Sequence, residues 1–349
     1  MKFFEKEQKI IYKKNIPPTD IFVNIQMKLV VGFLTYNDSS VKYLADFVPS
    51  LKNSLKFLSP TDYKVLVFDN SDPENNANRL ALELFNRDHH NFLEYLHAAG
   101  NLGFSRAYNI LIRSAARLKS EYFLVINPDT VLEKDTIAEL VKALDNDSSL
   151  ASVSPKIRRW DFAANTKTKI VDTCGLILKS GLRFRDLGQG QEDDKRFDQL
   201  NILGPSGAAG LFRLGALEQI KVNDQYFDER FFMYKEDCDL AYRLSVIEAK
   251  SNLVPTAIMY HDRTATSSGG GILNKISDRR KKSRQVRSWS FRNQHLIFVK
   301  HWSNQNLFSK TLIIFQVLLS GLFSLILEQF LLKEYMEVYS RFKVLTNVK

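Results

Sequence analysis

The stretch "KLVVGFLTYN", Lys28 to Asn37, is a short apolar run that ends in polar residues and precedes a helix-like segment. The same succession recurs along the first third of the chain. Strand-like runs separated by helices of this length predict a parallel sheet covered by helices, and therefore an α/β fold. The later runs of this kind are "YKVLVFDNSDP" (63–73), "NFLEYLHA" (91–98) and "SEYFLVINPDT" (120–130).

Polar residues gather where these strands are expected to end. Thr35 and Asn37 follow the first run, Asp69 follows the second, and Asn127 and Asp129 follow the fourth. Ligands of open α/β sheets bind beyond the carboxyl ends of the strands, so a nucleotide fits this edge. The chain has no P-loop, and no G-x-G-x-x-G follows the first strand. A divalent cation on Asp129 is another way to hold a diphosphate, although a lone Asp in such a turn is also a common helix cap.

A second acidic cluster lies in "FFMYKEDCDLAYRL", Phe231 to Leu244, where Glu236, Asp237 and Asp239 begin a helix-like run. One interpretation is a solvated helix start, because carboxylates there satisfy free backbone N–H groups. The other is a functional site. Asp237 shares a helix face with the apolar residues three, four and seven positions further on, which puts it at the open end of a packed face.

Composition sets the broad class of the protein. With 349 residues, 44% of them hydrophobic and 25% charged, the chain suits one large globular domain or two smaller ones. Cys174 and Cys238 fit neither a disulfide framework nor a zinc site, and favour a reducing compartment. The N-terminal stretch mixes charges through its apolar residues and offers no continuous signal-peptide core. We therefore expect a cytoplasmic protein.

The formal net charge of +10 is concentrated in one segment. Between Lys275 and Lys310 there are ten Lys or Arg and one acid, so the rest of the chain is almost neutral. Such a segment can bind nucleic acid or another polyanion, with Trp289, Phe291 and Trp302 available to stack on bases. It can equally attract an anionic membrane.

An apolar stretch at 311–332 follows the basic segment directly. Its polar residues recur every four positions, which draws a single polar stripe along an otherwise apolar helix. A basic segment followed by an amphipathic helix favours a membrane-surface anchor, and the alternative is a helix packed on the body of the protein. The polar residues of the stripe are Gln316, Ser320, Ser324 and Glu328.

Seven motifs in a fixed order carry a family resemblance. They are "VVGFLTYN", "VLVFDNSD", "NLGFSRAYN", "FLVINPDT", "GPSGAAGLFR", "FFMYKEDCDLAYRL" and "MYH". The series resembles the family 2 inverting glycosyltransferases, specifically their rhamnosyltransferase-like branch. The likeness covers roughly 28–263 and continues more loosely through "SFRNQHLIFVKHW".

The resemblance implies a GT-A fold, with a mostly parallel central sheet flanked by helices, and a nucleotide-diphosphate sugar as donor. Thr35 and Asn37 would then line the nucleotide pocket, and Asp69 would bond the base or ribose. The segment of Asn101 and Gly103 would close over the nucleotide. The donor-binding residues implied in this way are Thr35, Asn37, Asp69, Asn101, Gly103, Arg106, for which a phosphate contact is expected, and Asn127.

The resemblance also implies a divalent metal, Mg²⁺ or Mn²⁺. Asp129 would occupy the last position of the family's D-x-D-type motif, and His261 would be a further metal or diphosphate ligand. This chain has "NPD" there, with Asn127 in place of the first acid, so we expect weaker metal binding. The alternative for His261 is a hydrogen-bonded residue at a strand end.

Inverting transfer needs a base near the acceptor hydroxyl, a carboxylate within hydrogen-bond reach can supply it, and Asp237 is the candidate. Glu236 would orient the acceptor or the base. In "GPSGAAGLFR" we expect Gly207 and Ala208 to form a wall against the sugar or acceptor, the alternative being tight packing of strand on helix. The segment between Lys156 and Gln199 predicts a hairpin near the acceptor groove.

We therefore expect an inverting transferase that moves a sugar, with rhamnose favoured, from dTDP-rhamnose or a UDP-sugar. The acceptor would be a saccharide or a lipid-linked saccharide of a surface polysaccharide, met at the cytoplasmic face of a membrane and without a nucleic-acid partner. Two alternatives stay open: an inactive sugar-nucleotide-binding module, and a polyanion binder that uses 275–310. The predicted parts are an N-terminal extension (1–27), a catalytic domain (28–265) with nucleotide-binding (about 28–130) and acceptor (about 131–265) halves, and a basic helical region (266–349).

Overall fold

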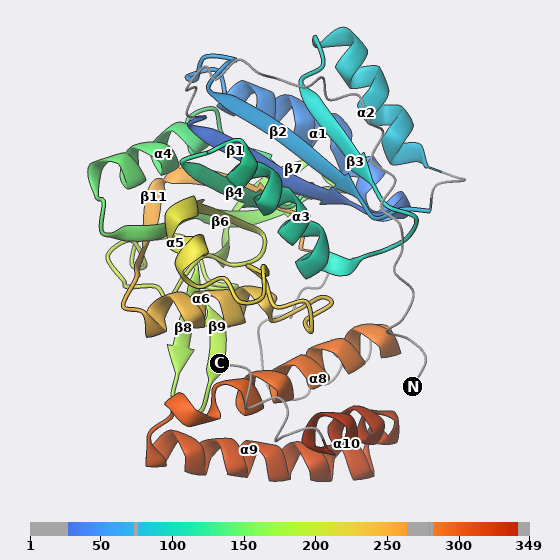
Figure 1. Cartoon of the computed structure of the whole chain (residues 1–349), viewed down its shortest axis with the longest axis vertical. Helices are drawn as coiled ribbons and strands as arrows, with labels where there is room; N and C mark the ends of the chain where they lie inside the picture. The colour runs from blue at the N-terminus through green and yellow to red at the C-terminus, as the bar shows by residue number, and fades with distance from the viewer. Residues whose placement is uncertain (1–26, 73–75, 264–278, 280–281, 341–349) are drawn as a thin grey trace.

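The structure, a computed structural model, describes residues 27–72, 76–263, 279 and 282–340. One large sheet carries helices on both faces, and a layer of C-terminal helices lies at the bottom of the molecule, below α6 (Glu236–Val246) and the β8–β9 hairpin (176–186) (Figure 1). The strands are β1 (Leu29–Thr35), β2 (Tyr63–Asp69), β3 (Leu93–His97), β4 (Tyr122–Ile126), β5 (Thr130–Leu132), β6 (Leu150–Asp161), β7 (Thr166–Thr173), β8 (Leu176–Lys179), β9 (Arg183–Asp186), β10 (Ala209–Arg213) and β11 (Lys250–His261).

The large sheet has the order β3-β2-β1-β4-β10-β6-β11-β5, and β7 pairs with β6. β3, β2, β1 and β4 run parallel to one another, which confirms the predicted α/β fold and the parallel sheet expected from the first third of the chain. β10 then runs antiparallel to both β4 and β6, so the second half of the sheet is mixed. β8 and β9 form a separate hairpin, in the segment where the sequence predicts one.

The apolar run of β1 is continuous because both of its faces are buried. Leu29, Val31 and Phe33 pack in one apolar cluster with the helices of one face, whereas Val30 packs with those of the other. Successive side chains of a strand point to opposite faces, so a sheet covered on both sides needs no polar alternation. The helices are α1 (Asn37–Ser54) and α4 (Thr136–Asn146) on the first face, α3 (Gly103–Arg117) and α6 (Glu236–Val246) on the second, with α2 (Ala77–Asp88) and α5 (Leu214–Gln219) at the margins.

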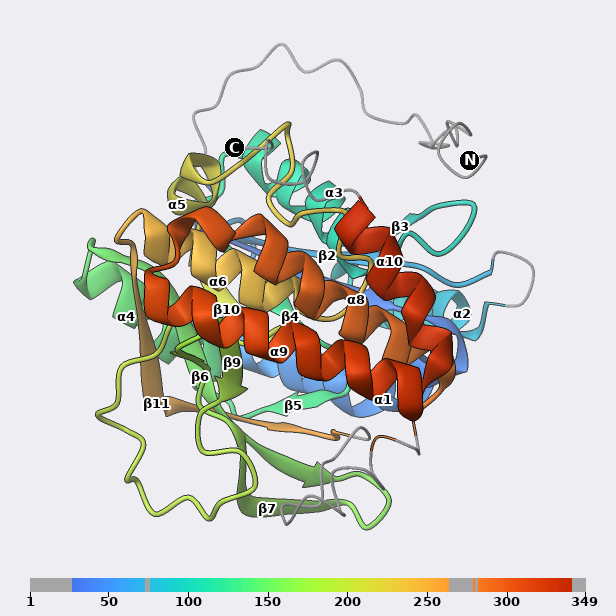
Figure 2. The ribbon, with the colours of Figure 1, turned by 90° about the horizontal axis from the view of Figure 1, so that it is seen from below.

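The C-terminal helices share a core with the sheet domain. In one apolar cluster Phe184 of the β8–β9 hairpin, Ala241 of α6, Ile297 of α8 (Arg284–Lys300) and Ile313 of α9 (Leu307–Ile326) pack together. Figure 2 shows α8, α9 and α10 laid side by side under the sheet domain, with α9 and α10 outermost. The elements of this layer are α8 (Arg284–Lys300), η1 (Trp302–Asn304), α9 (Leu307–Ile326), η2 (Gln329–Leu331) and α10 (Leu332–Ser340).

The predicted amphipathic helix at 311–332 is α9 with shifted ends. The helix begins at Leu307 because the Asn306 side chain accepts a hydrogen bond from the Ser309 N–H at 2.8 Å and caps it. It ends at Ile326, and Glu328 lies beyond it in ion pairs with Arg279 and Arg287. By length and composition alone, α9 is apolar enough to cross a membrane.

The predicted domain boundaries stay predictions. Residues 1–26 and 264–278, which include most of the N-terminal extension and the boundary near 265, lie outside the described residues. Two of the rings proposed for base stacking pack against the protein. The ring centroids of Trp289 and Phe232 are 4.9 Å apart, and Phe291 is buried.

Candidate active site

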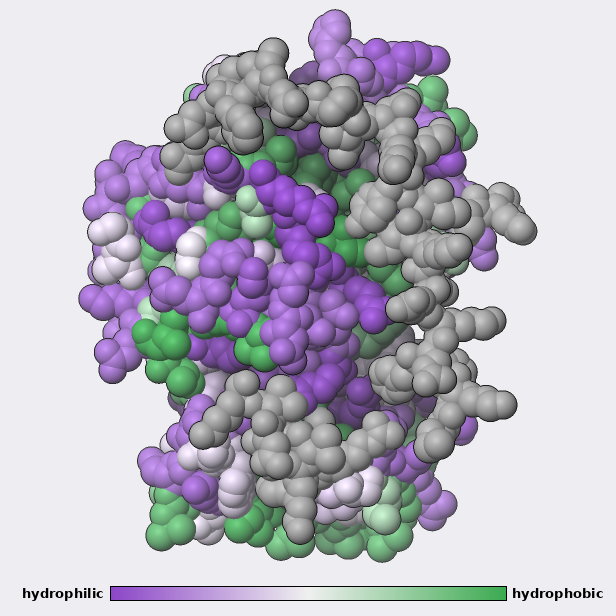
Figure 3. Space-filling model, in the orientation of Figure 1, coloured by the Kyte–Doolittle hydropathy of each residue, from purple (hydrophilic) through white to green (hydrophobic). Residues whose placement is uncertain are grey.

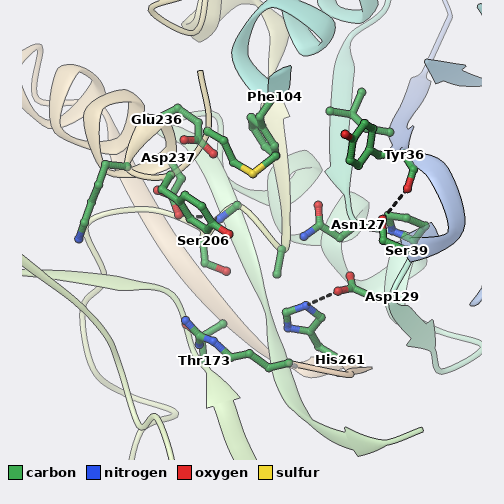
Figure 4. A pocket seen from close by; sticks show the side chains of 18 of the residues that line it. Tyr36, Ser39, Phe104, Asn127, Asp129, Thr173, Ser206, Glu236, Asp237 and His261 are labelled. Atoms are coloured by element: carbon green, nitrogen blue, oxygen red, sulfur yellow. Dashed lines mark hydrogen bonds and ion pairs between the residues drawn. The ribbon is translucent and has the colours of Figure 1, made fainter. Parts of the chain in front are cut away.

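A cleft of about 710 Å³ opens at the carboxyl ends of β1 and β4 (Figure 4). Its walls come from the ends of β1, β4, β7, β9 and β11, from the first turns of α1 and α6, from the loop before β10 and from α8. The residues predicted for the site that line it are Thr35, Asn101, Asn127, Asp129, Gly207, Ala208, Glu236, Asp237 and His261.

Asp237 and Glu236 stand on one wall of the cleft, at the first turn of α6. The Asp237 Oδ2 atom accepts a hydrogen bond from the Gly207 N–H at 2.9 Å, and its Oδ1 accepts one from the Cys238 N–H at 2.8 Å. Glu236 is buried, and its Oε2 has no partner. Burial, and then the neighbouring charge of Asp237, raise the pKa of Glu236 well above its usual range. The buried position of Glu236 therefore favours its protonated form, beside the hydrogen-bonded carboxylate of Asp237.

Asp239, the third acid of this turn, points away from the cleft into a buried ion network. It lies 2.8 Å from Lys300 Nζ and 2.8 Å from His301 Nε2, and it accepts a hydrogen bond from Arg243 Nε at 2.9 Å. Burial would raise the pKa of Asp239, but Lys300 and Arg243 outweigh it and hold that pKa well below its usual range. The interpretation of these acids as a solvated helix start is wrong for Asp239 and Glu236, which are both buried.

Tyr234 and Lys235, the two residues before α6, have a left-handed backbone, with φ of 73° and 72°. Non-glycine residues avoid this region, so the loop needs outside support. Asn293 of α8 supplies it: its Nδ2 donates to the carbonyl oxygens of Met233 at 2.9 Å and Tyr234 at 2.7 Å. The C-terminal layer therefore holds the loop that presents Glu236 and Asp237.

Asp129 and His261 meet on the other side of the cleft, at the ends of β4 and β11. His261 Nε2 lies 3.3 Å from Asp129 Oδ2, and its Nδ1 lies 2.8 Å from Asp172 Oδ2. Asp172 also accepts a hydrogen bond from Arg263, which donates to Asp186 as well. Burial works to lower the pKa of His261, but Asp129 and Asp172 outweigh it and raise the pKa to about 10.

Asp129 and His261 fit a cation site with two protein ligands. The Asp129 Oδ1 atom is buried and has no partner, and His261 turns a ring nitrogen toward the same carboxylate. Metal binding to His261 would require its shared proton to leave. Within the described residues no three His, Cys, Asp or Glu side chains group around one point, so a metal here would take further ligands from substrate or water.

Four buried side-chain oxygens without a partner converge on the cleft. They belong to Thr35, Asp129, Ser206 and Glu236. Buried polar atoms are normally hydrogen-bonded, and leaving one unpaired costs about 1–3 kcal/mol. Their gathering in one cleft indicates that a polar ligand completes the site.

Several predicted donor residues lie behind the cleft rather than in its lining. Asp69 is fully buried, and its carboxylate accepts from Ser71, from Asn76 Nδ2 at 2.5 Å and from Tyr95 OH at 2.6 Å. The Asn37 N–H donates to Ser71 Oγ at 2.7 Å. Asp69 and Asn37 thus brace the loops after β1 and β2.

Gly103 and Arg106 also lie outside the lining. Gly103 has a φ of +74°, and a Cβ there would come within 2.5 Å of the Phe232 carbonyl oxygen. This glycine lets α3 approach the loop before α6. Arg106 faces solvent and pairs with Glu229 at 3.0 Å.

The glycines of "GPSGAAGLFR" divide between two roles. A Cβ on Gly204 would lie 2.7 Å from the Ala241 Cβ, and one on Gly210 would lie 2.4 Å from the Pro205 Cβ, so these two serve close packing. Gly207 and Ala208 line the cleft. Sequence reasoning missed Ser206 in this stretch and also Asp172 and Asp186, for which the chain carries no local motif.

Comparisons with known proteins identify the family of the chain. The family model for glycosyl transferase family 2 matches residues 31–221. The low-salt glycan biosynthesis hexosyltransferase Agl10 of Haloferax volcanii is 29% identical over 162 residues, 44% of this chain and 47% of that protein. The chain thus spans about half the length of the curated relative it matches.

Solved structures show the fold. The structure of S. aureus TarS aligns with a TM-score of 0.51 and 15% identity over 91% of this chain and 49% of that one. The structure of GalNAc-T7 with UDP, GalNAc and Mn²⁺ aligns with a TM-score of 0.50 and 13% identity over 82% of this chain and 54% of that one. The GT-A-like fold and the predicted family are confirmed, and the rhamnosyltransferase-like branch stays a prediction. Since the family model covers 191 of its 349 residues, the chain belongs to glycosyl transferase family 2.

Proposed function

We propose that the chain transfers a hexose from a nucleotide-diphosphate sugar to an acceptor hydroxyl with inversion. The observation that carries this proposal is the cleft itself, in which Asp237 stands on one wall and Asp129 with His261 on another, around four unpaired buried oxygens. The family and the hexosyltransferase relative support the reaction class.

Asp237 is the proposed base. The acceptor hydroxyl attacks the anomeric carbon from the side opposite the diphosphate, and Asp237 takes its proton as the new bond forms. The N–H groups of Gly207 and Cys238 hold the carboxylate in one orientation. Burial raises the pKa of Glu236, and in its protonated form this side chain would donate a hydrogen bond that orients the acceptor.

The departing diphosphate needs a positive partner. Asp129 and His261 would hold the divalent ion, Mg²⁺ or Mn²⁺, which offsets the charge that grows on the leaving group. Asp172 fixes the ring of His261 from behind. The Mn²⁺ in the GalNAc-T7 structure supports the choice of metal only at the level of the fold.

Thr35, Asn101 and Asn127 are the proposed contacts to the donor. For Asn37, Asp69 and Gly103 we propose a bracing role behind that pocket. Rhamnose from dTDP-rhamnose is the favoured sugar and a UDP-sugar the alternative, on the resemblance of "NPDT" and its neighbours. The proposed acceptor is a saccharide or lipid-linked saccharide of a cell-surface polysaccharide.

The test is a screen for donor binding and hydrolysis on the purified full chain. dTDP-rhamnose and the common UDP-sugars are assayed with Mg²⁺, Mn²⁺ or EDTA, for wild type, Asp129→Ala and the exposed control Asp135→Ala. We expect metal-dependent binding or slow hydrolysis of one donor, lost only in Asp129→Ala. Binding of no donor would refute the proposal.

A further inference from the structure

The outer face of α9 is apolar and open to solvent. Along it lie Phe308, Phe315, Leu318, Leu322, Leu325 and Ile326, and Leu318 and Leu322 are 64% and 54% exposed. From Phe315 to Leu325 these positions repeat at three- and four-residue intervals, and Phe308 lies two turns before Phe315, so they form one strip, the apolar face of α9, on a 20-residue helix about 30 Å long. Figure 3 shows hydrophobic residues along the lower edge of the molecule, where α9 runs in Figure 1.

The polar stripe of α9 faces the protein instead of water. Gln316 Nε2 donates to the Gly181 carbonyl at 2.9 Å, Ser320 Oγ lies 3.1 Å from His295 Nε2, and Ser324 is fully buried. The Ser309 Oγ accepts from the Gly181 N–H at 3.1 Å. A surface helix of a soluble protein has the reverse arrangement, with its apolar side inward. The orientation of α9 indicates that an apolar medium covers its outer face.

An arginine cluster borders one end of the apolar face. Arg279, Arg284 and Arg287 line a pocket of about 480 Å³ together with Phe323, Ile326 and Phe330. Glu328 offsets part of their charge through ion pairs with Arg279 and Arg287. The pocket therefore keeps a net positive charge directly beside exposed apolar side chains, which is the chemistry of an interface with anionic lipid.

We infer that the apolar face of α9 docks lengthwise on an anionic bilayer, with Arg279, Arg284 and Arg287 at the level of the lipid phosphates. The three arginines favour anionic lipid over a second copy of the chain. A second copy would bring the same positive cluster to the face, whereas anionic lipid has the complementary charge. α9 lies along the bilayer and does not cross it, since crossing would break the hydrogen bonds of Gln316 and Ser309 to Gly181.

The experiment is co-sedimentation of the full chain with two kinds of vesicle, phosphatidylcholine alone and phosphatidylcholine with phosphatidylglycerol. Leu318→Ser/Leu322→Ser removes apolar area from the face. Leu80→Ser/Leu84→Ser on α2, where both leucines are also exposed, is the matched control. Arg284→Gln tests the cluster against Arg87→Gln, an exposed arginine of α2. Thermal melting checks that each variant is folded.

We expect wild type to bind the anionic vesicles, and binding to weaken with salt. The leucine pair on α9 should lower the partition coefficient by about tenfold or more, with its control unchanged. Arg284→Gln should lower it about fivefold on anionic vesicles alone. Absence of vesicle binding by wild type, or an equal loss in the α2 controls, would overturn the inference. So would a dimer that the α9 pair dissociates without any lipid binding, because the face would then join two copies of the chain.

Discussion

The Asp237 carboxylate accepts a hydrogen bond from the Gly207 N–H at 2.9 Å, which joins the first turn of α6 to the loop that leads into β10. A Cβ at position 207 would lie 3.4 Å from the same Oδ2 atom, so glycine keeps the space in front of the carboxylate open. The bond fixes which oxygen faces the loop and thereby sets the direction in which Asp237 can receive a proton.

Replacement of Asp237 by Asn should remove transfer while leaving the site intact. The Asn carbonyl can still accept from the Gly207 N–H, and only the hydrogen bond from the Cys238 N–H is lost, but an amide cannot take up the acceptor proton. We expect kcat to fall by about 10²- to 10⁴-fold with donor affinity unchanged. Transfer assays and donor titration check this, with Asp88→Asn, an exposed acid of α2, as control. A variant with near-wild-type turnover would take Asp237 out of the role of base.

Replacement of Glu236 by Gln should stabilise the protein at neutral pH but not at acidic pH. The folded protein keeps the Glu236 proton above the ordinary pKa of 4.5, because burial and Asp237 raise the pKa, whereas the unfolded chain releases it. The folded state then binds more protons, so this group makes folding less favourable as pH rises above 4.5.

A glutamine at this position does not titrate, so the stability of Glu236→Gln does not fall in this way as the pH rises. We expect the melting temperature of Glu236→Gln to exceed that of wild type by about 2 °C or more at pH 7, and the difference to vanish near pH 4. Melting curves at the two pH values decide the matter. A difference that does not change with pH would mean that Glu236 is ionised in the folded protein.

Replacement of Asn293 by Ala should lower turnover although this residue lies outside the cleft. The change frees the carbonyls of Met233 and Tyr234 and releases the left-handed turn before Glu236. We expect kcat to fall about tenfold to a hundredfold with unchanged donor affinity, because small misplacements of reacting groups are costly. Gln294→Ala on the same helix, whose Nε2 donates to Leu182 instead, is the control. Equal losses in both variants would point to a general effect on α8.

Replacement of Asp172 by Asn should weaken metal binding. Asp172 holds His261 Nδ1 at 2.8 Å, and partners of this kind set the ring orientation of a ligand histidine. We expect the affinity for Mn²⁺ to fall about 10- to 100-fold, measured by Mn²⁺ titration with electron paramagnetic resonance. Asp161→Asn, an exposed acid at the end of β6, should leave it unchanged. Wild-type affinity in Asp172→Asn would show that the ring needs no such support.

The sequence was most informative where a local pattern carries the structure. The apolar runs of β1, β2 and β4 predicted the parallel half of the sheet, and polar residues after those runs predicted the edge where the cleft opens. Asp172 and Asp186 were not predicted, because their partners at the cleft, His261 and Arg263, lie 89 and 77 residues further along the chain.

The stripe on α9 shows a different limit. The four-residue period of the stripe can be read from the sequence. Whether the stripe faces water or the protein cannot, because that depends on which residues pack against the helix. In the structure the partners are Gly181 in the turn of the hairpin and His295 of α8. A pattern in one helix cannot tell a water-facing polar side from one that hydrogen-bonds to the protein.

The β8–β9 hairpin connects the two surfaces that this protein offers. Its turn touches α9 at Gly181, and Arg185 and Asp186 at its other end line the cleft. Its strands are four residues long, which corresponds to roughly 14 Å. If α9 lies on lipid as inferred above, the length of the hairpin sets the distance between the bilayer surface and the cleft. For the proposed lipid-linked acceptor, the glycan would then have to be long enough to span that distance before its terminal hydroxyl reached the cleft.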